Sequence, residues 1–226
     1  MIFPIGDQQI EGGHKPLFTY SLIAMNIVVF LYEISLPMEG TDWFVNHYGA
    51  IPLEILGGDD FYTLISCMFL HGGWMHLIGN MLFLWVFADN IEAIIGTFNF
   101  LLFYLLGGIV ASAIHIFFNP YSEVPMVGAS GAISAVMGAY LILFPASKIK
   151  VLVLIFFRSF YIPAIFFLGF WIVQQMFAGF GSLGVSEQNT GGVAWWAHIG
   201  GFIFGVVSGF IAKSAYKNKY RYDVEA

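Results

Sequence analysis

Six mostly apolar stretches, each long enough to cross a bilayer as a helix, constrain this chain more than any other feature. A helix needs about 20 such residues to cross the roughly 30 Å of hydrocarbon in a bilayer. Of the 226 residues, 59% are hydrophobic and only 10% are charged, whereas soluble domains carry about 25% charged residues. We therefore predict an all-α polytopic membrane protein built around a six-helix transmembrane bundle. The predicted spans are residues 17–36, 74–93, 98–118, 128–145, 160–178 and 193–213.

All eight lysine and arginine residues fall on one side of this predicted bundle. They precede the first span, surround the connection between the fourth and fifth spans, or follow the sixth: Lys15, Lys148, Lys150, Arg158, Lys213, Lys217, Lys219 and Arg221. The loops on the opposite side carry acidic residues and no basic ones. Because cytoplasmic loops are enriched in basic residues, both termini are predicted to be cytoplasmic. The chain then divides into a short N-terminal segment (1–16), the bundle (17–213) and a C-terminal tail (214–226).

Three connecting segments have a distinctive composition. The first outer loop, 37–73, is long, aromatic and acidic, and its apolar stretch 61–70 is expected to dip into the outer leaflet. The apolar segment 150–157 lies among basic residues, so we expect it at the inner interface and not as a seventh span. The outer loop 179–192 is rich in Gly and Ser and is expected to act as a mobile flap.

Four polar side chains are predicted to share one depth inside the bundle. His76 and Asn80 are one helical turn apart in the second span, Ser130 begins the fourth, and His198 lies in the first turns of the sixth. These three spans run in the same direction, and a rise of about 1.5 Å per residue places the four side chains roughly 5–12 Å below the outer surface. Polar groups at such a depth are costly unless they have partners, and they indicate a functional site.

Small residues predict how the fourth and sixth spans meet. Gly201, Gly205 and Gly209 lie on the helix face of His198, and Ser134 and Gly138 follow Ser130 on its face: each stripe permits close backbone approach. Packing these stripes together would bring the Ser130 hydroxyl to the His198 ring.

This arrangement favours nucleophilic catalysis by a serine and a histidine. A serine needs an adjacent base, and histidine suits that role. No acidic residue is placed to orient His198, so the pattern favours a dyad over a triad. The backbone N–H of Ser130, with the side chains of His76 and Asn80, could stabilise an oxyanion.

Each of these features alone has an ordinary structural explanation. A serine in a membrane helix often bonds to its own backbone, and glycine stripes are common in helix packing; it is their combination that favours a site. His71 could serve the mouth of the site or simply pack, and His115 is interpreted as structural. Asp89, Asn90 and Glu92, at the inner end of the second span, could form an interfacial cap or interhelical bonds.

Three motifs resemble those of the rhomboid family of intramembrane serine proteases, in the same order. FLHGGWMHLIGNMLF (69–83) carries His76 and Asn80 in the H-x-x-x-N pattern. GASGA (128–132) is similar to the family's nucleophile motif, and AHIGGFIFG (197–205) to its histidine helix. The motif glycines are Gly128, Gly131, Gly200 and Gly201. The resemblance covers nearly all of residues 17–213.

The resemblance implies hydrolysis of a peptide bond in or beside a transmembrane helix of another membrane protein. Ser130 would form the acyl-enzyme, His198 would act as base and then acid, and no metal or cofactor would be needed. Tyr62 and Thr63 stand where many relatives carry a Trp-Arg pair. Ser134 replaces a tyrosine that stacks on the histidine in some relatives, so another group, such as Trp195 or the glycine stripe, must position His198.

Other classes of protein fit the sequence less well. A rhomboid-like pseudoenzyme that binds client helices would not need both Ser130 and His198, and a transporter would favour internal repeats and a polar file through the membrane. The net charge of -6 gives no support for nucleic-acid binding. The expected partners are therefore the lipid bilayer and transmembrane protein substrates. The N-terminus resembles neither a signal peptide nor a transit peptide, which favours a prokaryotic cytoplasmic membrane.

Overall fold

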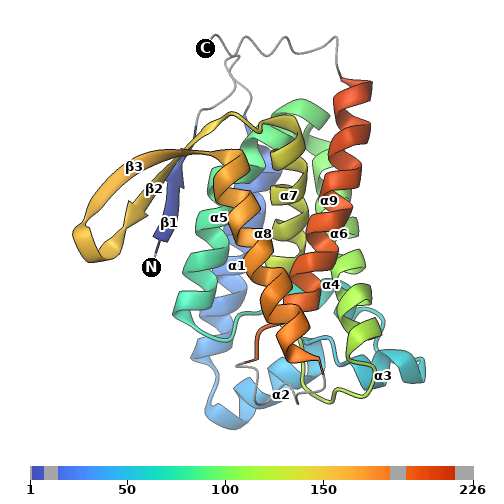
Figure 1. The fold of residues 1–226 in the computed structure, drawn as a ribbon. Helices are drawn as coiled ribbons and strands as arrows, with labels where there is room; N and C mark the ends of the chain where they lie inside the picture. The colour runs from blue at the N-terminus through green and yellow to red at the C-terminus, as the bar shows by residue number, and fades with distance from the viewer. Residues whose placement is uncertain (1, 8–14, 184–191, 217–226) are drawn as a thin grey trace.

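A bundle of apolar helices makes up most of the molecule. The computed structural model describes residues 2–7, 15–183 and 192–216. In that part of the chain, five helices are long and apolar enough to cross a membrane. They are α1 (Leu17–Ser35), α5 (Trp74–Ile95), α6 (Thr97–Phe118), α8 (Ala164–Ser182) and α9 (Trp195–Ala215). The shorter apolar helix α7 (Ser130–Leu143) completes the bundle (Figure 1). The predicted mostly helical, polytopic fold is confirmed.

Helix α7 lies at the centre of the bundle, where it contacts α5, α6, α8 and α9. Every residue from 131 to 140 is buried. The 14 residues of α7 rise only about 21 Å, less than the roughly 30 Å of bilayer hydrocarbon. The predicted range 128–145 was too long at both ends, because the helix covers only Ser130–Leu143. Gly128 has a φ of 121°, outside the helical region, and Pro145 disfavours a helical Phe144 before it.

Close backbone contact joins α7 to α9, as the small-residue stripes predicted. A Cβ atom on Gly201 would collide with the carbonyl oxygen of Gly131, and one on Gly205 with that of Ala135. In the reverse direction, a Cβ on Gly138 would collide with the carbonyl oxygen of Phe202. Only glycine permits this approach, so the stripe fixes the position of α9 relative to α7.

The first outer loop is largely helical and lies across one end of the bundle (Figure 1). It contains α2 (Met38–Tyr48), α3 (Pro52–Gly57), α4 (Thr63–Ser66) and the 3-10 helix η1 (Cys67–Phe69). Cys67, Met68 and Leu70 are buried against the bundle, whereas Trp43, Phe61 and Tyr62 are exposed. Insertion of this loop into the outer leaflet stays a prediction.

A three-stranded antiparallel sheet at the other end of the bundle is an addition that the sequence did not predict. Its order is β1 (Ile2–Gly6), β2 (Lys148–Val153), β3 (Arg158–Pro163). Ile149 and Val151 alternate toward the bundle and are fully buried, as the period of two in a strand requires. Because residues 158–163 pair with β2, the fifth span begins at residue 164 and not at 160. Segment 150–157 forms part of the hairpin and does not span the bundle, in line with the expectation.

The first strand is fixed to the bundle by a buried carboxyl group. Asp7, just after β1, accepts a hydrogen bond from Asn90 Nδ2 of α5 at 2.5 Å and another from the Tyr140 hydroxyl of α7. The Tyr140 hydroxyl also lies 2.9 Å from Ser147 Oγ. Burial raises the pKa of Asp7 to about 6, although both hydrogen bonds act in the opposite direction.

Glu92 settles one alternative that the sequence left open. Its carboxylate accepts hydrogen bonds from the backbone N–H groups of Phe18 (3.1 Å) and Thr19 (2.9 Å) and from the Thr19 hydroxyl (2.8 Å). The first turn of a helix has N–H groups without intrahelical partners, and a negative charge is favourable there. Glu92 of α5 therefore caps α1 from a neighbouring helix, so the cap and the interhelical bond are the same interaction.

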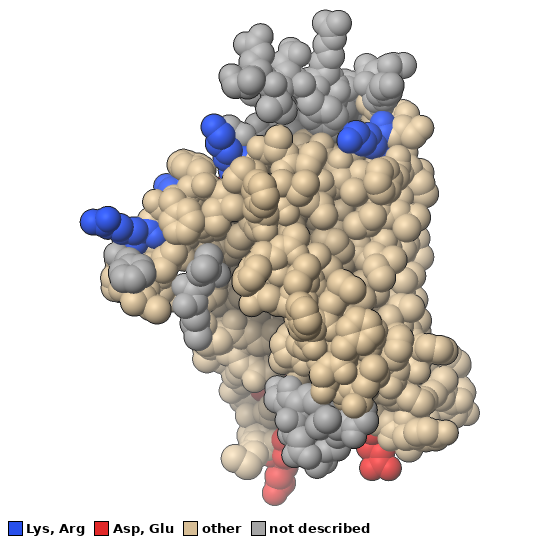
Figure 2. Space-filling view, in the orientation of Figure 1, with Lys and Arg blue, Asp and Glu red and all other residues tan. Residues whose placement is uncertain are grey.

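The two ends of the bundle differ in charge. Figure 2 shows lysine and arginine at the end where α9 finishes and acidic residues at the opposite end. This asymmetry follows the distribution on which the predicted orientation rests. The predicted flap lies mainly outside the described residues, since 184–191 are not described and 179–182 belong to α8. Most of the predicted N-terminal segment after Asp7 and most of the tail also lie outside them.

Candidate active site

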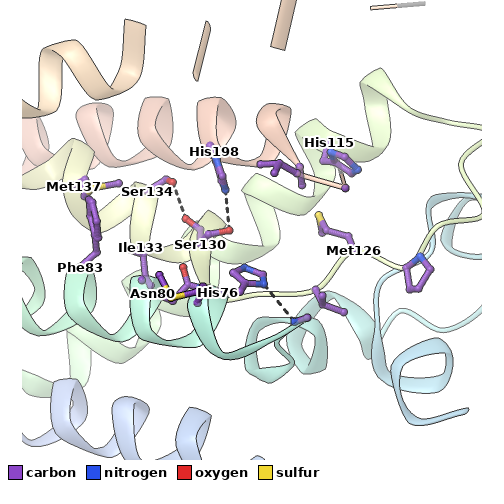
Figure 3. Close-up of a pocket in the computed structure, with 18 of the residues that line it drawn as sticks. His76, Asn80, Phe83, His115, Met126, Ser130, Ile133, Ser134, Met137 and His198 are labelled. Atoms are coloured by element: carbon purple, nitrogen blue, oxygen red, sulfur yellow. Dashed lines mark hydrogen bonds between the residues drawn. The ribbon is translucent and has the colours of Figure 1, made fainter. Parts of the chain in front are cut away.

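The structure brings Ser130 and His198 into hydrogen-bond contact. Ser130 Oγ lies 2.9 Å from His198 Nε2 (Figure 3). Ser130 is the first residue of α7 and His198 lies in the first turn of α9, so the glycine contact between these helices also sets the distance between the two side chains. The Ser134 hydroxyl donates to the Ser130 carbonyl oxygen at 2.6 Å. The Ser134 hydroxyl is therefore used in a hydrogen bond to the backbone of its own helix, whereas the Ser130 hydroxyl faces the imidazole.

His76 and Asn80 lie on α5, across the cavity from His198 (Figure 3). Asn80 Nδ2 is 3.0 Å from His71 Nε2. Burial lowers the pKa of His71 to about 4, so at neutral pH its Nε2 can accept one amide hydrogen from Asn80. The second hydrogen of that amide is then available to a group in the cavity. His71 thus contacts the site indirectly, through its hydrogen bond with the Asn80 side chain.

The motif glycines are required by the same geometry. Gly128 has a positive φ, and a Cβ there would come within 2.7 Å of His76 Nε2. A Cβ on Gly131 would lie 2.7 Å from the Cβ of Ala111. One on Gly200 would lie 2.6 Å from the Cβ of Ile114 on α6. Together with Gly201, these positions let the loop before α7, and the helices α6, α7 and α9, approach one another at the site.

All four predicted polar residues line a cavity of about 610 Å³. Its volume falls in the range of about 300–1,000 Å³ typical of ligand sites. Beyond the polar residues, the wall is mainly apolar. Helices α5, α7 and α8 contribute Met75, Phe83, Ile133, Met137 and Trp171, and the segments 124–127 and 192–194 also contribute to this wall. His115 also lines the cavity, and its Nδ1 lies 3.4 Å from Asn119 Nδ2 of the same helix end. The cavity therefore brings a serine, a histidine and an amide together beside apolar side chains.

Sequence reasoning missed the contribution of α8. Gln175 Oε1 lies 2.8 Å from His198 Nδ1, and the ring of Trp171 lies 5.9 Å from the His198 ring, measured between centroids. Trp195, one of the two alternatives suggested for positioning His198, makes an edge contact at 6.1 Å between ring centroids. The only signal in the sequence was a pair of glutamines, Gln174 and Gln175, inside an otherwise apolar span.

Comparisons with known proteins point to one family. A family model described as the rhomboid domain matches residues 58–215. The rhomboid protease GluP of Bacillus subtilis is 38% identical over 128 residues, covering 56% of this chain and 24% of GluP. Rhomboid protein 1, mitochondrial, of Saccharomyces cerevisiae is 28% identical over 218 residues, covering 92% of this chain and 60% of that protein. The putative rhomboid protease YdcA of B. subtilis is 32% identical over 126 residues, 56% of this chain and 61% of YdcA. The chain thus spans between about a quarter and three fifths of the length of these relatives.

Proposed function

The chain belongs to the rhomboid family, and from this premise we propose that it is an intramembrane serine endopeptidase. Its substrates would be membrane proteins, cleaved in or next to a transmembrane helix by Ser130 and His198. The observation that carries the proposal is the 2.9 Å contact between Ser130 Oγ and His198 Nε2 at the wall of a 610 Å³ cavity. An unactivated serine is a weak nucleophile, and a histidine at this distance can accept its proton.

In the proposed reaction, Ser130 Oγ attacks the carbonyl carbon of the scissile peptide bond while His198 Nε2 takes the hydroxyl proton. The tetrahedral intermediate carries its negative charge on the former carbonyl oxygen. The Ser130 N–H at the start of α7, the free Asn80 amide hydrogen and the His76 ring would stabilise that charge. His198 then gives its proton to the departing amine, which leaves an ester on Ser130. A water molecule, deprotonated by His198, hydrolyses the ester and restores the dyad.

A substrate helix must open before this chemistry can occur. Its peptide groups are hydrogen-bonded within the helix, and the attacking serine needs an exposed carbonyl group. Small or helix-breaking residues lower the cost of unwinding, so the proposed substrates carry such residues near the cleavage site. We also propose that the basic end of the bundle faces the cytoplasm, which places the cavity toward the outer face of the membrane.

The first test is labelling and cleavage by the purified protein in detergent. We expect a fluorescent fluorophosphonate to label the parent, and the parent to cleave a model transmembrane substrate. Ser130→Ala and His198→Ala should do neither, whereas Ser134→Ala should still be labelled because its hydroxyl only bonds to the Ser130 carbonyl. A folded parent that neither labels nor cleaves would refute the proposal and favour a rhomboid-like protein that binds client helices without cutting them.

A further inference from the structure

Helix α8 makes a polar contact with the proposed dyad through the buried side chain of Gln175. Four residues of α8 are buried. Ala164, Leu168 and Gly179 are small or apolar, and Gln175 is the polar member of this set. Gln175 is 7% exposed, whereas its neighbour Gln174 is exposed. Burying an amide is unfavourable unless its hydrogen bonds are made, so the partners of Gln175 indicate what the residue does.

The two ends of the Gln175 amide have different partners. Nε2 donates to the Trp171 carbonyl oxygen, one turn earlier in α8, at 3.3 Å. Oε1 therefore points at His198 Nδ1, at 2.8 Å. An amide oxygen can only accept a hydrogen bond, so Nδ1 must carry the proton. Neutral imidazole has one protonated nitrogen, which leaves His198 Nε2 as the acceptor that faces Ser130 Oγ.

We propose that Gln175 is a positioning residue that holds His198 in the tautomer and orientation needed to deprotonate Ser130. This inference rests on the proposed protease function and deepens it. The active unit then comprises Gln175, His198 and Ser130, from three different helices. Trp171, one turn from Gln175, supplies an aromatic contact to the same imidazole.

Substitutions at position 175 can distinguish a positioning role from simple packing, because glutamine is a neutral hydrogen-bond acceptor. A glutamine can fix the tautomer of His198, but it adds no negative charge to stabilise the imidazolium that forms during the reaction. Glutamate at the same place would accept from Nδ1 and also favour the charged ring. Leucine would fill a similar volume and accept nothing. These two substitutions therefore predict different pH profiles and not merely different activities.

The experiment compares Gln175→Leu and Gln175→Glu with Gln174→Leu and Gln174→Glu, matched changes at the exposed neighbour. We expect Gln175→Leu to lower kcat by about 10- to 100-fold with little change in KM, as for the loss of one hydrogen bond to a group that becomes charged. Gln175→Glu should recover much of kcat at high pH and move the acid limb of the profile to higher pH. The Gln174 variants should match the parent. Equal activity in Gln175→Leu and the parent, or identical acid limbs in all variants, would overturn the proposal.

A second readout does not depend on activity. Nitrogen NMR of protein labelled in its histidines reports which ring nitrogen carries the proton, and the His198 signals are those missing from His198→Ala. We expect the Nδ1-protonated form in the parent and a mixture of tautomers in Gln175→Leu. An Nε2-protonated ring in the parent would refute the role of Gln175 even if the protein cleaves substrates. Conversely, a parent with the expected tautomer but no cleavage would refute only the protease function.

Discussion

Replacing Asp7 with Asn should remove a pH dependence from the stability of the N-terminal strand. Asp7 is enclosed by Asn90 of α5 and Tyr140 of α7, and burial raises its pKa from 3.8 to about 6. A pKa raised in the folded state means that folding favours the protonated carboxyl. The associated stability is therefore complete below about pH 4 and is lost as pH rises through about 6.

The size of this effect follows from the shift. Two pKa units correspond to about 3 kcal/mol, at about 1.4 kcal/mol per unit. We expect the docking of β1 to weaken by up to that amount between pH 4 and pH 7 in the parent. In Asp7→Asn, the side-chain oxygen can still accept from Tyr140 and cannot ionise, so the contribution of residue 7 to this pH dependence should disappear.

Hydrogen exchange measured by mass spectrometry on residues 2–7 and 148–153 reports this docking directly. Exchange rates, corrected for the intrinsic effect of pH, give the opening free energy of the strand pair at each pH. Asp59→Asn, a change to an exposed carboxylate in the first outer loop, serves as the control and should follow the parent. Parallel curves for the parent and Asp7→Asn between pH 4 and 7 would show that the buried-carboxyl argument is wrong.

Three further changes test other parts of the structure. Gly205→Ala places a Cβ against the Ala135 carbonyl oxygen and should cost about 1–3 kcal/mol in thermal or denaturant unfolding; Gly169→Ala, which meets no atom within 4 Å, is the matched control, and equal losses would contradict the packing argument. Asn80→Ala should lower kcat by about 10²–10³-fold with little change in KM, and a pure KM effect in steady-state assays would argue against an oxyanion role. Glu92→Ala should destabilise α1 by about 1–2 kcal/mol, because it removes a cap made of three hydrogen bonds; unchanged exchange in the first turn of α1 would refute this.

The parts of the site that lie on regular, closely packed helices could be predicted from the sequence. The distance between Ser130 and His198 follows from two stripes of small residues, because glycines at a helical spacing leave little freedom in how α7 and α9 can pack. The contribution of Gln175 could not be predicted in this way. Helix α8 presents a mostly apolar surface to its surroundings, so a glutamine in it carries no periodic signal that says which neighbour it meets.

The sheet escaped prediction for a different reason. Strand β1 pairs with β2, about 145 residues later, and such a pairing leaves no local pattern in a five-residue strand that contains a proline. The alternation in Lys148–Val153 was visible, but basic residues beside an apolar run equally suit a segment lying at the membrane surface. The boundaries of α7 were also predicted wrongly. The apolar sequence continues beyond both ends of the helix to Gly128 and Phe144, whose backbone lies outside the helical region.

The shortness of α7 makes the depth of Ser130 depend on the thickness of the membrane around the protein. A helix of 14 residues that begins at Ser130 is too short to reach both surfaces of an ordinary bilayer, so its ends lie inside the thickness that the longer surrounding helices span. Longer acyl chains would leave Ser130 deeper below the headgroups and farther from bulk water, and shorter chains would bring it closer. Lipid composition would thereby change the access of water to Ser130, without any ligand bound to the protein.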